Sequence, residues 1–353
     1  MLYHMNYMLT NQLQRNRNIS ILVLLLLSFF IHACQEKSKP SKIKPVDEEV
    51  SLEIMRFEKD LFYMEQNDMD ASLKKLAEKY PGFYEVYFEQ MMGFGNSKNP
   101  DFKFIVKDFI NNKDFKLLVA DCDTIYNANR TEKMKEEIAE VFKRYKAVYP
   151  NDTIPKVCTF VSGFANGIVN TDGYIGIGLD LFLGANYKFY PSLDLPEYLI
   201  RRYTPEHLVP TFVKGLATSK YEEVNTTVFL DRMLYEGKLI YFAKQFLPDY
   251  TDSLIIGYTS AQMKWSIENE NNIFQLLVSE DLFSTDVLKY RKYTDEAPYT
   301  VNLTADSAPR IAWFIGLKII EKYMEENPTI SLDELMKEKD SQKILRLSKY
   351  KAK

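Results

Sequence analysis

The chain has 353 residues, of which 46% are apolar and 27% are charged, and its formal net charge is −4. This composition is that of a globular protein and excludes a largely disordered one. The acidic balance argues against a nucleic-acid partner, since general nucleic-acid binders carry a basic excess or stripe.

Residues 1–33 are predicted to be a lipoprotein signal peptide. Two arginines and no acidic residue precede the apolar run 19–31, which is shorter than the roughly 20 residues that span a bilayer. Ala33 then precedes Cys34, and an apolar run, a small residue and a cysteine in this order are typical of bacterial lipoproteins. Cleavage would leave Cys34 at the mature N-terminus as the site of lipid attachment. The alternative is a secreted protein with an incidental cysteine.

Residues 34–50 are predicted to be a tether between the lipid anchor and the domain, because they are charged, contain proline and hold few apolar residues. Gln35 replaces the aspartate that retains some lipoproteins in the inner membrane, which slightly favours the outer membrane. The domain would then lie in the periplasm or at the cell surface. Residues 51–353 contain no comparable linker and no repeat, so we expect a single domain there.

The first part of the domain is predicted to be helical. Residues 54–64 open it, residues 71–92 have a helical composition that is broken at Pro81 and Gly82, and residues 131–149 carry apolar residues at helical spacing. The apolar positions of the last of these are Met134, Ile138, Val141, Phe142 and Tyr145.

After residue 155 the apolar residues no longer follow helical spacing, and two short stretches instead look like strands of a small sheet. Residues 156–162 and 174–179 are predicted strands, with residues 170–173 (NTDG) as a turn between them. Cys122 and Cys158 could pair in an oxidising periplasm, but two cysteines alone do not show that they do.

Helices are predicted again after residue 195. Thr204 and Pro205 begin one, residues 228–246, 260–280 and 307–327 form three more, and residues 331–334 (SLDE) are a capping box for a short last helix. Pro309 is expected in the first turn of the helix at 307–327. The predicted fold class is therefore α+β, mainly α, with a small sheet among helices.

Two of these helices have the layout of a zinc metallopeptidase without its ligands. A catalytic zinc needs three protein ligands, and an HExxH helix supplies two histidines and a glutamate that acts on the bound water. The helix at 206–220 contains HLVPTFVKGL, in which His207 is the one histidine after residue 33. Glu236, before Gly237 on the next helix, stands where such enzymes often place the third ligand. We therefore predict no metal, no cofactor and no catalytic activity.

Glu236 has a simpler interpretation. It lies four residues after Arg232, and such a pair forms a helix-surface salt bridge worth about 0.3–0.5 kcal/mol. Gly237 in mid-helix indicates that a neighbouring backbone packs closely there. The chain also has no GxSxG, no GxxxxGK[ST] and no GxGxxG motif, which argues against the corresponding hydrolase and nucleotide-binding sites.

The chain resembles the GldB family of gliding motility lipoproteins, and the resemblance covers nearly all of the chain after the signal peptide. It is carried by several stretches in the same order, among them RFEKDLF (56–62), VSGFANGIVNTDGYIGIGLDLFLG (161–184), LDRMLYEGKLIYFAKQFLPD (230–249) and SAPRIAWFIGLKII (307–320). The family in turn resembles predicted zinc-dependent proteases that keep HExxH. The resemblance implies a protein that is anchored through Cys34, required for gliding and connected with type IX secretion. It implies no known catalytic activity.

These observations predict a non-catalytic, lipid-anchored component of the gliding machinery on a degenerate zincin-like domain. Its role would be that of a scaffold, an assembly factor or a peptide binder, with the membrane and other gliding or secretion proteins as partners. We expect a vestigial cleft at Gly176, Leu179, His207 and Glu236, where an edge strand would pair with an extended peptide. The alternatives are a metallopeptidase with unusual ligands and a ligand-binding lipoprotein unrelated to motility.

Overall fold

The computed structural model describes residues 43–221 and 227–352. The predicted signal peptide, Cys34 and the first part of the tether lie outside the described residues. The described part of the chain is mainly helical and holds one mixed sheet of four strands, which confirms the α+β, mainly α prediction. No helix in these two ranges is long and apolar enough to cross a membrane.

The sheet has the order β1 (Ile54–Arg56), β2 (Lys156–Phe160), β4 (Tyr174–Gly178), β3 (Ile168–Thr171). The first three strands run parallel, and β3 is antiparallel to β4. Both predicted strands are confirmed, whereas β1 and β3 were not predicted because three or four residues are too few to show alternation. A two-residue turn joins β3 to β4, and Gly173 takes its positive φ of 79°.

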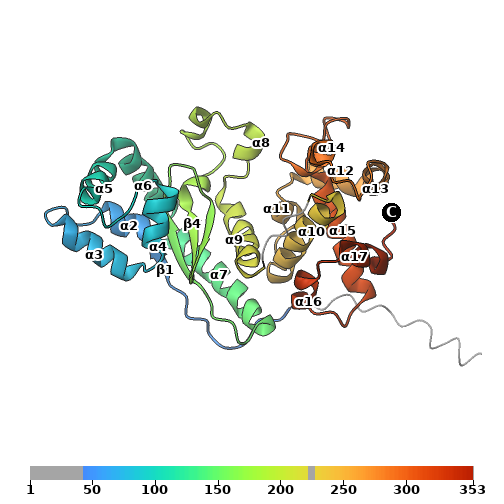
Figure 1. The fold of residues 1–353 in the computed structure, drawn as a ribbon, viewed down its shortest axis with the longest axis horizontal. Helices are drawn as coiled ribbons and strands as arrows, with labels where there is room; N and C mark the ends of the chain where they lie inside the picture. The colour runs from blue at the N-terminus through green and yellow to red at the C-terminus, as the bar shows by residue number, and fades with distance from the viewer. Residues whose placement is uncertain (1–42, 222–226, 353) are drawn as a thin grey trace, which may run out of the picture. The chain divides into compact units, whose positions relative to one another are not determined.

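Six helices that follow β1 in the chain lie on one side of the sheet (Figure 1). They are α2 (Phe57–Phe62), α3 (Met69–Lys79), α4 (Phe83–Glu85), the π-helix η1 (Val86–Met91), α5 (Phe102–Asn111) and α6 (Lys113–Ile125). The predicted break at Pro81 and Gly82 is confirmed between α3 and α4, where Gly82 has a φ of 81°. The ring of Phe83 lies 5.8 Å from that of Phe160 in β2. Burial of such rings stabilises the contact between helices and sheet.

The opposite side of the sheet is occupied by α9 (Pro205–Lys220), which packs against β3, and by α7 (Ala128–Val148) beside α9. The five predicted apolar residues of α7 are all buried, and the predicted start of α9 at Thr204 and Pro205 is confirmed. A Cβ added to Gly215 of α9 would lie 2.5 Å from Cγ2 of Ile168 in β3. A larger residue at this position would therefore require the Ile168 side chain to move.

The short helices η2 (Leu179–Leu181), η3 (Tyr190–Leu193) and α8 (Glu197–Ile200) lie in the connection from β4 to α9. The helices after α9 pack around one central pair, α10 and α15. They are α10 (Phe229–Phe246), α11 (Asp252–Ile256), α12 (Ser260–Glu268), α13 (Glu270–Ser279), α14 (Val287–Thr294), α15 (Ile311–Glu326), α16 (Leu332–Lys337) and α17 (Ser341–Ser348). A Cβ added to Gly237 would lie 2.7 Å from the backbone nitrogen of Leu317. The predicted close approach of a backbone to Gly237 is therefore confirmed.

Three predicted details of these helices can be compared with the structure. The predicted helix at 260–280 is two helices, α12 and α13, which meet at Asn269. Pro309 lies before α15 and not in its first turn, because Arg310 adopts a left-handed conformation at the N-cap. The capping box of α16 is confirmed, with both of its hydrogen bonds between Ser331 and Glu334 present.

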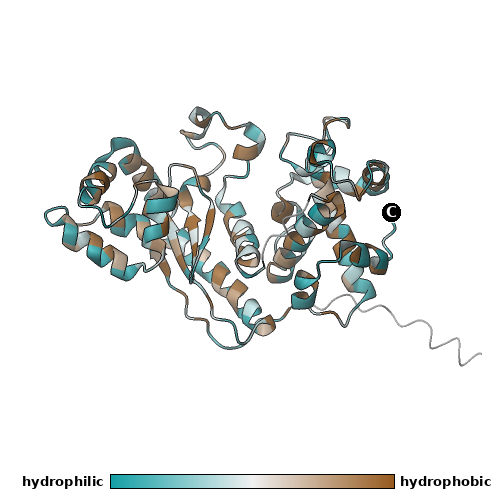
Figure 2. Cartoon of the chain, in the orientation of Figure 1, coloured by the Kyte–Doolittle hydropathy of each residue, from teal (hydrophilic) through white to brown (hydrophobic). Residues whose placement is uncertain are grey.

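The described core is largely apolar, and both of its cysteines are buried in it. Figure 2 shows mostly hydrophobic residues along the strands, whereas hydrophilic and hydrophobic residues alternate along α3. Cys122 in α6 and Cys158 in β2 are free, so they do not form a disulfide. The described end of the predicted tether, residues 43–50, contains no helix or strand, although the N–H of Val46 donates to the carbonyl of Lys143 in α7.

Candidate functional site

Gly176 and Leu179, two residues of the expected cleft, lie in the core. Leu179 has no exposed surface, and a Cβ on Gly176 would lie 2.8 Å from the ring of Phe83. Gly176 lies in β4 and Leu179 follows this strand directly, and β4 pairs with β2 on one side and β3 on the other. The prediction that an edge strand lies here is therefore wrong, because the short strand β3 takes the edge position.

Glu236 has the predicted partner but not the predicted location. Its carboxylate lies 3.6 Å from the guanidinium of Arg232. However, Glu236 is only 9% exposed, because α10 is a central helix of its bundle and not a surface one. The predicted pairing with Arg232 is confirmed and the predicted surface position is wrong. The pair is thus less screened by solvent than a surface pair.

His207 lies in the first turn of α9 and lines a cavity of about 180 Å³, which we call the His207 cavity. The Thr204 hydroxyl lies 2.9 Å from Nδ1 of His207. Thr211 stands four residues further on, in the place of the second histidine of an HExxH helix, and its hydroxyl donates to the carbonyl of His207. Although residue 207 stands at the start of a helix, where side chains are commonly exposed, the side chain of His207 is half-buried.

The surroundings of His207 disfavour a metal cation. Burial, followed by the positive charges of Arg202 and Lys214, lowers the pKa of His207 to about 4. A divalent cation would meet the same repulsion from these side chains. Within residues 43–221 and 227–352, no three His, Cys, Asp or Glu side chains gather in a group that could hold a metal ion.

A long hollow on the described surface follows α7 and was not predicted from the sequence. It consists of two adjoining pockets of about 640 and 310 Å³, which share Glu137, Asp249 and Tyr250. We call them together the α7 groove. One wall is α7 itself, and the other is formed by the start of α9 and by residues 246–254, which join α10 to α11.

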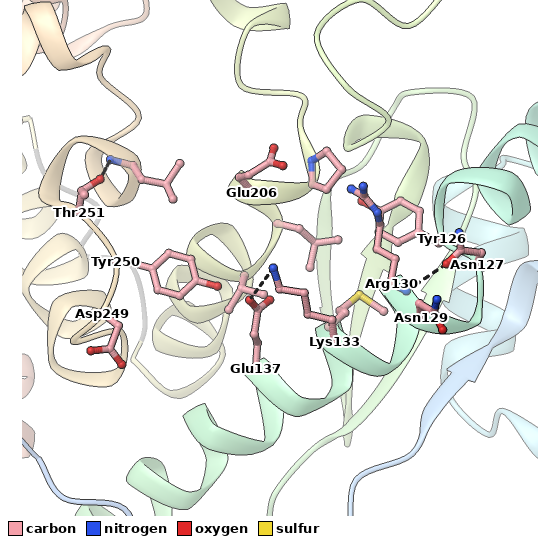
Figure 3. A pocket seen from close by; sticks show the side chains of 15 residues that line it. Tyr126, Asn127, Asn129, Arg130, Lys133, Glu137, Glu206, Asp249, Tyr250 and Thr251 are labelled. Atoms are coloured by element: carbon pink, nitrogen blue, oxygen red, sulfur yellow. Dashed lines mark hydrogen bonds and ion pairs between the residues drawn. The ribbon is translucent and has the colours of Figure 1, made fainter.

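The α7 groove has an apolar floor and charged rims. Its floor is formed by Met134, Val141, Leu208, Val209, Phe246, Leu247 and Leu254. Figure 3 shows Lys133 paired with Glu137, at 3.9 Å, and the Tyr250 ring pointing toward them from the opposite wall. Burial and the neighbouring Glu137 raise the pKa of Tyr250. Such a lining suits an amphipathic polypeptide better than a small apolar ligand.

Asp180, in the stretch YIGIGLDLFLG, has a structural role. Its carboxylate is fully buried and accepts hydrogen bonds from the backbone N–H groups of Ser162 and Phe164, at 2.9 and 2.6 Å. Burial raises the pKa of Asp180 to about 6, although these N–H groups favour the ionised form. Asp180 lines neither the α7 groove nor the His207 cavity. Its bonds fix the loop after β2, where Gly163 and Phe164 both have a φ of 69°.

The comparisons with known proteins give one match. A family model described as "Gliding motility protein GldB" matches residues 36–352. No curated protein matches the chain, and no solved structure does either. The match confirms the predicted family, and the comparisons give no support to the predicted resemblance to zinc-dependent proteases.

Proposed function

The chain belongs to the gliding motility protein GldB family, and we propose that it is a non-catalytic, lipid-anchored component of the gliding machinery. In this proposal Cys34 carries the lipid and the α7 groove holds a polypeptide segment of another gliding or type IX secretion protein. The role is that of a scaffold or assembly factor in the cell envelope. The observation that carries the proposal is the α7 groove, with its apolar floor and charged rims.

The length of the groove supports a polypeptide as its occupant. Its lining runs along α7 from Asn129 to Arg144, which is about 22 Å at 1.5 Å per residue. An extended chain rises about 3.3 Å per residue, so roughly seven residues would fill this length. A flat or shallow surface would not select such a segment.

The charges of the groove indicate which segment would fit. Arg130 and Lys133 line the end near the N-terminus of α7, whereas Glu136, Glu137 and Glu140 follow along the helix. Complementary charge fixes the direction of a bound peptide and disfavours wrong partners. Glu140 is already paired with Lys143 and Arg144. We therefore propose an extended segment with an acidic residue at the Arg130 end, apolar residues on the floor and a basic residue toward the exposed Glu136.

The polar groups of the groove support a binding role over a catalytic one. A general acid or base works best with a pKa near the operating pH. The pKa of Tyr250 is raised away from neutrality by burial and by Glu137, and Lys133 is paired with Glu137. These groups are arranged as rim contacts and not as an activated nucleophile with its base.

Reversal of the basic end of the groove tests the proposal. The double variant Arg130→Glu, Lys133→Glu is expected to abolish or strongly slow gliding, since two lost charged contacts reduce affinity by about ten- to a hundredfold. Lys135→Glu is the matched control, because Lys135 lies on the same helix outside the groove and pairs with Glu132. Cell speed would be measured at equal protein level. Normal gliding of the double variant would contradict the proposal.

A further inference from the structure

We infer that the His207 cavity is a binding site for a carboxylate carried on a small apolar group. The cavity lies between the loop after β4, the loop before α9, α9 itself and the end of α11. It shares only Leu254 with the α7 groove. The inference therefore stands whether or not the groove binds a polypeptide.

The charged groups that line the cavity are cations. Arg202 and Lys214 both reach it, from the loop before α9 and from the third turn of α9. Lys214 donates to the carbonyl of Ile255, at 3.2 Å, and no carboxylate of the described residues lies within ion-pair distance of it. The Nε of Arg202 is buried and has no hydrogen-bond partner in the described part of the chain. Both side chains thus keep donors that an anion could use.

A third cation lies directly behind the cavity. Arg310 is 1% exposed, stacks over the ring of Trp313 at 4.4 Å and donates to the carbonyl of Gly257, a residue that lines the cavity. Its Nη1 is also without a hydrogen-bond partner among the described residues. Buried guanidinium groups are normally paired and fully hydrogen-bonded.

The positive charge around the cavity exceeds the negative charge. Among the described carboxylates, that of Glu296 forms ion pairs with these cations, 2.8 Å from Arg202 and 3.3 Å from Arg310. Glu236 and Glu206 also act on the group, through Lys214 and His207 respectively, without an ion pair to either of these described residues. Burial, together with the charges of Arg310 and Arg202, lowers the pKa of Lys214 to about 8, although Glu236 and Glu296 act in the opposite direction. Buried like charges destabilise a fold unless a counter-ion joins them. A bound anion would supply that counter-ion.

The other walls of the cavity select the kind of anion. Leu181, Phe182, Pro210 and Leu254 are apolar and line the same space. A volume of about 180 Å³ corresponds to roughly six water molecules at ~30 Å³ each, which is more than a bare carboxylate fills. A phosphate ion would leave the apolar walls without contacts. A monocarboxylate with an aliphatic body would satisfy both parts of the lining, as a free acid or as the C-terminal residue of a peptide.

His207 provides the readout for a test on the full chain in detergent. Butyrate, a short peptide that ends in leucine, butyramide and inorganic phosphate would each be titrated while NMR follows the imidazole of His207, assigned by the loss of its signals in His207→Gln. Butyrate or the peptide acid is expected to give a saturable shift and to raise the pKa of His207, because the anion offsets the neighbouring cations. Whichever of butyrate and the peptide binds with the higher affinity identifies the source of the carboxylate, a free acid or a peptide C-terminus.

Lys214→Met separates binding from general effects of salt. This change removes a buried charge and keeps the shape of the side chain, so the fold should persist, and the affinity for the carboxylate should fall about tenfold or more. Lys264→Met, at a side chain 76% exposed on α12, should leave the affinity unchanged. Equal binding of butyramide or phosphate, an unsaturable response, or full affinity in Lys214→Met would overturn the inference.

Discussion

Gly316→Ala is expected to lower the free energy of unfolding by about 3 kcal/mol or more. Gly316 lies where α15 crosses α10, and an added methyl group would lie inside the van der Waals radius of the Met233 carbonyl. The atoms that the methyl group would meet first are the backbone carbon and oxygen of Met233. Because a backbone in a well-packed helix cannot move aside by itself, the two helices must separate before the methyl group fits. The sign of the effect is informative, because Gly→Ala in an uncrowded helix stabilises by up to about 1 kcal/mol.

Gly215→Ala is the matched control for this prediction, since Gly215 is also a mid-helix glycine. Its added methyl group would meet Cγ2 of the Ile168 side chain, which can move more easily than a backbone. We expect a smaller loss, of about 1–2 kcal/mol, from this change. Urea denaturation followed by circular dichroism would compare the two variants. Equal stabilities of Gly316→Ala and the unchanged protein would contradict the observed helix crossing.

Glu58→Ala is expected to cost about 2–3 kcal/mol, because it removes a buried partner of Arg56 and leaves the buried Thr159 hydroxyl without its acceptor. Glu58 is completely buried beside β2, pairs with Arg56 and accepts a hydrogen bond from the Thr159 hydroxyl at 2.7 Å. Arg56 is also held by Asp123, at 3.1 Å. The stretch RFEKDLF therefore joins the start of the domain to β2 and α6.

The exposed pair between Lys103 and Asp70, at 2.6 Å, is the control for the buried one. Asp70 is 73% exposed, and removal of such a surface partner typically costs less than about 1 kcal/mol. Asp70→Ala and Glu58→Ala would be compared by the same denaturation experiment. If both cost the same, the network around Glu58 does not hold the sheet to α2 and α6 as the structure indicates.

The elements that the sequence predicted best are long and regular. Residues 131–149 contain apolar side chains at helical spacing over about three turns, and the structure buries all five predicted positions in α7. Strands β1 and β3 have three and four residues, which is too short for a periodic pattern to stand out. The failure to predict β3 also explains why β4 was wrongly expected to be an edge strand. β3 pairs with the side of β4 that was expected to be open.

The two hollows could be predicted only in part, because their walls come from distant segments. His207 and Glu236 stood out by residue type and position. Arg202, Lys214 and Arg310 look like ordinary surface cations in the sequence, and only the fold brings them to one cavity. The α7 groove needs residues 246–254 as part of its second wall, about a hundred residues after the end of α7. A pattern within one helix carries no information about such a neighbour.

The proposal that the α7 groove binds a polypeptide is tested most directly by site-specific photocrosslinking in gliding cells with the lipid anchor intact. A photoreactive amino acid would replace Asn129 and Tyr250, one on each wall of the groove, and Lys264 on α12 as an exposed control. We expect both groove positions to capture the same protein, through one short segment with an acidic and a basic end, and Lys264 to capture none of it. Groove positions that yield only the background pattern of Lys264 would contradict the proposed function.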